Sequence, residues 1–129
     1  FVRKLESHAS RSVLIVSFFD APQSYLRPLW KAVYGQDRID LPALPELVGV
    51  LWGMDIYPDV EMFQAGPTQL FDTHEDAVQQ LGSRLYVAAG TDRERRLRRA
   101  LKDLLVQTPD GLALKSARPR RTGLAKWSP

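Results

Sequence analysis

The spacing of apolar positions predicts an alternation of helices and strands. Residues 1–9 carry apolar side chains at helical spacing, which predicts the end of an amphipathic helix. Residues 13–19 (VLIVSFF) are almost wholly apolar and rich in residues that favour strands, a pattern typical of a strand buried on both faces in a parallel sheet. A helix, a strand and then a turn at residues 20–22 together indicate an α/β fold.

The rest of the chain continues this alternation and carries signals at the helix starts. Thr73 with Asp76, and Thr91 with Glu94, have the spacing of capping boxes, so a helix is expected to begin after each threonine. Residues 109–111 (PDG) indicate a turn that ends the second of these helices, whose buried stripe is expected to run to residue 105. The remaining expected elements are helices at residues 29–34 and 45–52 and strands at residues 59–63 and 121–127.

Composition narrows the class of protein. The chain has 129 residues, 44% of them hydrophobic and 26% charged, which is typical of one globular domain with its own core. It contains no cysteine, so disulfide scaffolds, thiolate nucleophiles and cysteine-ligated zinc are excluded. No stretch approaches ~18 consecutive apolar residues, so no membrane partner is expected. The lack of cysteine also fits a reducing compartment, and we expect a cytoplasmic protein.

Charge is distributed unevenly along the chain. Residues 1–91 carry 7 Lys+Arg and 11 Asp+Glu, whereas residues 92–129 carry 11 and 4. Such a basic end could belong to a non-enzymatic module that contacts nucleic acid through residues 92–126. The cations alternate with leucines, however, as on the solvated face of an amphipathic helix, and no aromatic residue interleaves with them for base stacking. Nucleic acid is therefore the alternative partner, and the run in question is Arg93, Arg95, Arg96, Arg98, Arg99 and Lys102.

Motifs for several kinds of chemistry are absent from the sequence. The glycines never form G-x-G, and no G-x-x-x-x-G-K-[ST] occurs, so neither the dinucleotide nor the P-loop fingerprint is present. A covalent hydrolase would need a nucleophile elbow of the G-x-S-x-G type, which is also lacking. His8 and His74 lie far apart, and the acids after His74 suit the first turn of a helix, so no metal site is expected.

The long loop after the strand at residues 13–19 is the best candidate for a binding site. Open α/β sheets bind ligands beyond the carboxyl ends of their strands, and Asp20 stands at such an end. Trp30 and Tyr34 follow it, so a carboxylate between aromatic walls would form a substrate pocket. The alternative is that Trp30 and Tyr34 are ordinary core residues beneath a long loop.

Several segments resemble bacterial class I S-adenosylmethionine-dependent methyltransferases, Rossmann-like proteins of unassigned substrate. The resemblance rests on residues 13–19 (VLIVSFF), 29–38 (LWKAVYGQDR), 43–56 (ALPELVGVLWGMDI), 59–63 (DVEMF) and 120–127 (RRTGLAKW). It implies that residues 1–9 are the helix before strand five and residues 13–19 strand five itself. Residues 59–63 would be strand six, and residues 121–127 strand seven, antiparallel and inserted next to strand five.

The resemblance also implies what this chain lacks. In that family a Gly-rich loop after the first strand and an acid after the second hold S-adenosylmethionine, and neither has a counterpart here, so no cofactor-binding residue is carried over. Residues 1–129 would thus be a single partial domain, the C-terminal half of the methyltransferase sheet (mixed, last strand antiparallel) with flanking helices. Asp20, Trp30 and Tyr34 would lie on the side of an unknown methyl acceptor. The isolated piece is expected to be inactive and to self-associate through its exposed sheet edge.

Overall fold

The computed structural model describes residues 1–129, which form two compact units. Unit 1 contains Phe1–Pro22, Asp40–Gly66 and Arg120–Pro129, and unit 2 contains Gln23–Ile39 and Pro67–Pro119. Both units combine helices with strands, so the predicted α/β class is confirmed, while the single partial domain stays a prediction. No helix is both long enough and apolar enough to cross a membrane.

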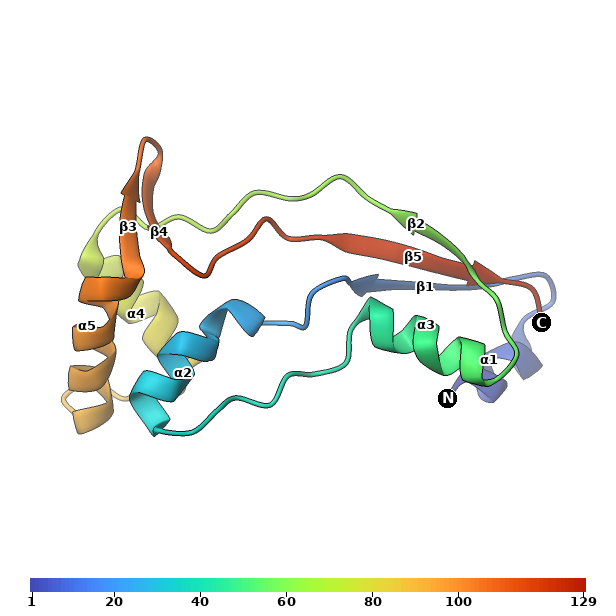
Figure 1. The fold of residues 1–129 in the computed structure, drawn as a ribbon, viewed down its shortest axis with the longest axis horizontal. Helices are drawn as coiled ribbons and strands as arrows, with labels where there is room; N and C mark the ends of the chain where they lie inside the picture. The colour runs from blue at the N-terminus through green and yellow to red at the C-terminus, as the bar shows by residue number, and fades with distance from the viewer. The chain divides into compact units, whose positions relative to one another are not determined.

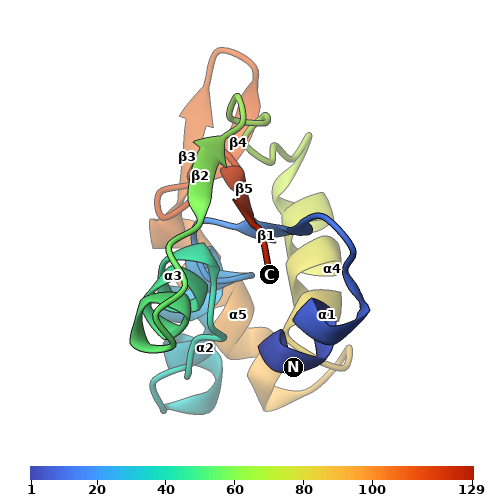
Figure 2. The ribbon, with the colours of Figure 1, turned by 90° about the vertical axis from the view of Figure 1, so that its right-hand side faces the viewer.

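Unit 1 is a three-stranded antiparallel sheet with two helices on one face (Figures 1 and 2). Because the last strand runs antiparallel to both of its neighbours, the two outer strands run in the same direction. The predicted helices and strands of this part of the chain are all confirmed. In sheet order the strands are β1 (Val13–Phe18), β5 (Thr122–Trp127) and β2 (Asp59–Met62), and the helices are α1 (Val2–His8) and α3 (Leu44–Gly53).

The face of the sheet that the helices cover holds the core of unit 1. Val13 of β1 lies opposite Trp127 of β5, and both side chains are buried. Val2 of α1 and Leu51 of α3 pack against this pair in one apolar cluster. The burial of Val2 agrees with the predicted apolar side of α1, whereas Phe1, assigned to the same side, is 85% exposed. Long-range packing thus joins three separate segments of the chain into one core.

The second face of β1 is open to solvent, contrary to the expectation of a strand buried on both faces. Leu14 and Val16 are 58% and 62% exposed, because α1 and α3 both pack on the opposite face. The prediction of a mixed sheet is also wrong for these residues, since every pair of neighbouring strands is antiparallel. The reason is that β5 lies between the two strands that run in the same direction. The antiparallel last strand itself is confirmed.

Unit 2 is a group of helices with a two-stranded hairpin (Figure 1). A short 3-10 turn, Ser24–Leu26, leads into α2 (Arg27–Tyr34), which confirms the short helix predicted there. The helices α4 (His74–Arg84) and α5 (Asp92–Leu104) meet α2 around buried leucines. The core cluster of unit 2 contains Leu26, Leu29, Val33, Phe71, Ala77, Val78, Leu81, Leu85, Leu97, Leu101 and Leu114.

Both threonine signals mark helix starts, as predicted. Thr73 Oγ1 accepts a hydrogen bond from Asp76 N, and Thr73 N donates to Asp76 Oδ2, so this capping box is complete. Thr91 Oγ1 accepts from Glu94 N, but the Glu94 carboxylate accepts from Gly90 N instead of the threonine amide. The start of α5 therefore has the expected hydrogen bond from Glu94 N to the N-cap Thr91, but it lacks the reciprocal hydrogen bond of a capping box.

The hairpin of unit 2 replaces the expected end of the last helix. α5 stops at Leu104, and the next residue begins β3 (Leu105–Thr108), which pairs with β4 (Gly111–Leu114). The turn predicted at residues 109–111 joins these strands. Gly111 has φ 140°, and a Cβ there would lie 3.1 Å from the carbonyl oxygen of Phe71, so this position requires glycine. Pairing with β4 overrides the helical periodicity that reaches residue 105.

Candidate functional site

An ion pair occupies the end of β1 in unit 1, where the sequence places a candidate site. Asp20 follows β1, and Arg121 precedes β5, so the antiparallel register brings the two residues together. Arg121 Nη2 lies 2.6 Å from Asp20 Oδ1, and Arg121 Nε lies 2.9 Å from Asp20 Oδ2. This two-point hydrogen bond raises the pKa of Arg121 above its usual value. The carboxylate predicted to face substrate is thus held by a guanidinium.

One aromatic ring lies against this ion pair, and a second lies beside the neighbouring Arg120. The Arg121 guanidinium lies 4.2 Å from the centroid of the Phe19 ring, and Arg120 lies 5.7 Å from that of Phe18. The Asp20 side chain is 42% exposed, so its remaining lone pairs can accept a hydrogen bond from an N–H or O–H group. The arrangement can therefore orient a polar group beside an apolar wall, without a nucleophile of its own.

Arg121 is the residue that the sequence reasoning missed at this site. In the sequence it lies 101 positions from Asp20 and reads as part of the basic end of the chain. The only signal that could have linked the two residues is the inferred antiparallel strand at 121–127 beside residues 13–19, because that pairing places the start of one strand at the end of the other.

Trp30 and Tyr34, the other two predicted site residues, lie in unit 2 on α2. Their ring centroids are 4.4 Å apart, and both side chains pack against the core cluster of that unit. Tyr34 Oη donates to the carbonyl oxygen of Leu85 at 2.5 Å. The structure therefore brings Trp30 and Tyr34 together as partly buried residues, in agreement with the alternative that they are core, and it places Asp20 in the other unit. Their role in binding substrate stays a prediction.

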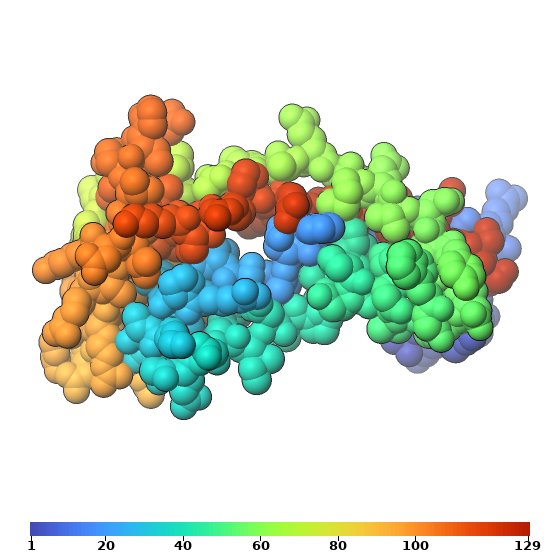
Figure 3. Space-filling view, in the orientation of Figure 1, coloured from blue at the N-terminus to red at the C-terminus, as the bar shows by residue number.

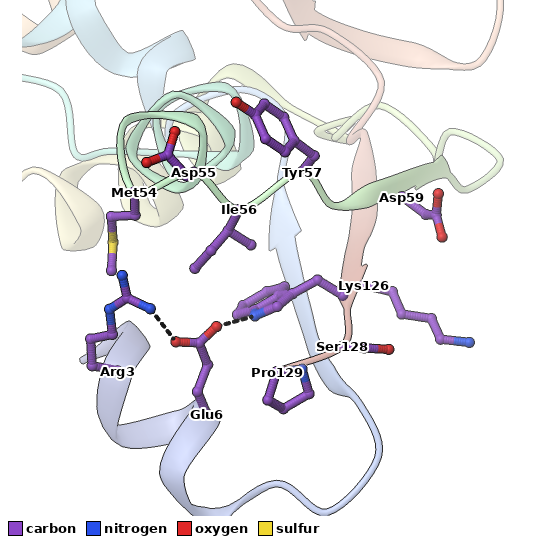
Figure 4. Close-up of a pocket in the computed structure, with 11 residues that line it drawn as sticks. Arg3, Glu6, Met54, Asp55, Ile56, Tyr57, Asp59, Lys126, Ser128 and Pro129 are labelled. Atoms are coloured by element: carbon purple, nitrogen blue, oxygen red, sulfur yellow. Dashed lines mark hydrogen bonds and ion pairs between the residues drawn. The ribbon is translucent and has the colours of Figure 1, made fainter.

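A cavity of about 390 Å³ lies in unit 1 at the opposite end of the sheet from Asp20 (Figure 4). Glu6 of α1 reaches into it and accepts hydrogen bonds from Arg3 Nη1 at 3.0 Å and from Trp127 Nε1 at 3.2 Å. The Glu6 side chain is only 14% exposed. These contacts fix α1 to the end of β5, so we interpret Glu6 as a structural acceptor. The cavity is further lined by Met54, Asp55, Ile56, Tyr57, Asp59, Lys126, Ser128 and Pro129.

An ion-pair group in unit 2 involves part of the arginine run. Arg98 donates to both carboxylate oxygens of Glu75, at 2.7 and 2.8 Å, and to Glu94 at 2.8 Å. These hydrogen bonds lower the pKa of Glu75 and of Glu94 below their usual values and raise that of Arg98. Arg98 therefore joins α4 to α5 and is not an unengaged surface cation.

Comparison with known proteins gives no match for this chain, whether with family models, with curated proteins or with solved structures.

Proposed function

We propose that this chain is the acceptor-side half of a class I S-adenosylmethionine-dependent methyltransferase, which transfers a methyl group to an acceptor still unknown. The proposal rests on the resemblance described above and on one structural observation. On the face of the unit 1 sheet that the helices leave open, the edge strand β2 carries acidic side chains and the edge strand β1 carries apolar ones, as expected if the sheet continues beyond β1 only.

The two edges differ on the face that the helices leave open. On the edge strand β2 this face carries Asp59 and Glu61, both exposed. On the edge strand β1 it carries the three apolar side chains Leu14, Val16 and Phe18, which are 58%, 62% and 38% exposed. Charged residues are a common means of closing a sheet edge, whereas an apolar edge strand invites further pairing. We infer that the sheet continues beyond β1 and ends at β2.

The backbone of β1 supports the same inference. Phe19 N donates to Arg121 O, so in this antiparallel register the odd-numbered residues of β1 direct their peptide groups toward β5. The even-numbered residues direct theirs to the other side, where no strand pairs with them. Three alternate residues of β1, namely Leu14, Val16 and Phe18, therefore have a peptide donor and acceptor available for another strand.

The order of the strands is compatible with the resemblance. The family plan has two strands that run in the same direction, with an antiparallel strand inserted next to the first of them. In unit 1, β1 and β2 run in the same direction and β5 is inserted between them. The helices that precede β1 and β2 both pack on one face, which agrees with the flanking helices that the plan requires.

The role that we propose for this half is to position the methyl acceptor. S-adenosylmethionine, when bound, supplies a methyl group that is already activated, so catalysis depends largely on proximity and orientation. The resemblance carries no cofactor-binding residue over to this chain, since the Gly-rich loop and the acid of the family have no counterpart. Asp20, held by Arg121, would accept a hydrogen bond from the acceptor and orient it.

The test compares residues 1–129 with the complete open reading frame from the same gene. We expect upstream codons for a strand that runs into G-x-G, followed about twenty residues later by an acid. In titration calorimetry the complete protein should then bind S-adenosylhomocysteine, and residues 1–129 should give no heat of binding. The proposal is refuted if a start codon directly precedes Phe1, if the complete protein gives no binding, or if residues 1–129 bind by themselves.

A further inference from the structure

All of the excess positive charge of the chain belongs to unit 2. Unit 2 has 12 lysines and arginines against 8 aspartates and glutamates, a net charge of +4, whereas unit 1 has 6 against 7, a net charge of −1. The attraction that this charge exerts on an anionic partner depends on where the cations lie and on which of them are already paired.

The arginines of α5 fall into two groups. Arg98 and Arg95 are engaged by carboxylates of their own unit, namely Glu75, Glu94 and Asp92. The other group, Arg93, Arg96 and Arg99, recurs every third residue and borders the side of α5 that packs against α2. Arg96 donates to the carbonyl oxygen of Val33 on α2, and Arg99 makes no hydrogen bond or ion pair within the chain.

A hollow of about 520 Å³ lies along this line of contact. It is lined by Ala32 of α2 and by Arg96, Arg99, Ala100 and Asp103 of α5, with Leu104 at its end. Figure 3 shows side chains of α2 and α5 next to each other on the surface of unit 2. The small residues Ala32 and Ala100 keep the hollow open between the arginines. We name this feature the α2–α5 groove, with Arg93 at its amino end.

Aromatic rings adjoin the cations at the amino end of this groove, although none interleaves with them in the sequence. Arg93 lies 4.8 Å from the ring centroid of Tyr34, which in turn stacks on Trp30. Arg38 lies 5.9 Å from the ring centroid of Trp30. Guanidinium planes and aromatic rings are the surfaces on which unpaired bases stack. The packing of α2 against α5 therefore places aromatic rings beside the cations, with the Arg93 guanidinium over the Tyr34 ring as a plane that a base can meet.

We propose that the α2–α5 groove binds single-stranded nucleic acid, with Arg93, Arg96 and Arg99 on the phosphates and the Trp30–Tyr34 pair at the bases. Phosphate contacts give such binding its salt dependence, and base stacking adds affinity that polyanions without bases do not gain. The inference does not depend on methyl transfer. Asp103 is the one carboxylate in the groove and should oppose the phosphates.

The test measures binding of a labelled single-stranded RNA 12-mer to residues 1–129 by fluorescence anisotropy over a series of salt concentrations. We expect a Kd on the order of 1–100 µM near physiological salt and a steep weakening as salt rises. The double variant Arg93→Gln/Arg99→Gln should lower the slope of log K against log salt by about 1.4, at ~0.7 per phosphate contact in single strands. Asp103→Asn should tighten binding.

Two controls make the outcome specific to the groove. The double variant Lys115→Gln/Arg118→Gln removes the same charge from exposed positions elsewhere in unit 2 and should leave the affinity and the salt slope unchanged. Inorganic polyphosphate and poly-glutamate, which have no bases, should compete weakly. The proposal is overturned if no RNA binding is detected, if the control variant weakens binding as much as the groove variant, or if either base-free polymer competes as well as RNA.

Discussion

The position of β5 between β1 and β2 depends on the absence of a side chain at Gly123, which makes Gly123→Ala an informative variant. A Cβ at this position would lie 2.6 Å from Leu44 Cδ2, 2.8 Å from Met62 Sδ and 3.0 Å from the carbonyl oxygen of Glu61. All three distances are shorter than ordinary carbon contacts, so neighbouring groups must move to admit even one methyl group.

The cost follows from which of these groups can move. The Met62 side chain is 44% exposed and can rotate away into solvent. Leu44, the first residue of α3, is 2% exposed and has little room to move. The Glu61 oxygen belongs to the backbone of β2, so it can move only if the strand moves. Overpacking of this kind costs about 1–3 kcal/mol, and the one mobile neighbour favours the lower half of that range. We therefore expect Gly123→Ala to destabilise unit 1 by ~1–2 kcal/mol.

The assay is urea unfolding followed by tryptophan fluorescence, because Trp127 is buried in the same unit. The matched control is Gly49→Ala, the same change in the interior of α3, where a Cβ would meet no atom within 4 Å. That control should stabilise the protein by up to ~1 kcal/mol, since alanine favours a helix over glycine. If Gly123→Ala leaves the unfolding midpoint unchanged or raises it, Gly123 does not pack closely against Leu44 and Met62, and the reasoning from these distances is refuted.

Two further predictions concern the edge strand and the ion-pair group. Residues 1–129 should self-associate in sedimentation velocity, and Val16→Lys should give monomers because it places a charge on the unpaired strand β1. The control Val50→Lys, at a similarly exposed valine on α3, should still self-associate. A monomeric unsubstituted chain would contradict this prediction. The folded state lowers the pKa of Glu75 and of Glu94 below the ordinary value of 4.5, so their stabilising contribution is present above about pH 4.5 and is lost as pH falls through the lowered values. The Tm should therefore fall as pH is lowered below about 4.5, and Arg98→Gln should reduce that fall. An equal fall in both proteins would contradict this.

The local elements of this protein could be predicted from its sequence because their signals are short-range. A threonine three residues before an acid satisfies the first amides of a helix whatever surrounds it, and both such sites start helices. The apolar run at residues 13–19 is a strand for an equally local reason, since it concentrates residues that favour strands. The hairpin at residues 105–114 is the exception, because its first strand continues the helical pattern of leucines and only pairing with β4 decides its conformation.

The candidate site depended on contacts between distant segments, which the sequence does not encode locally. The sequence by itself determined that a carboxylate, Asp20, ends a strand, and that arginines gather near the end of the chain. Only the tertiary structure decided that Arg121 pairs with Asp20, and that Tyr34 lies beneath Arg93. The physical reason is that strand register and helix packing bring together residues dozens of positions apart, whereas periodicity and capping act within one or two turns of chain.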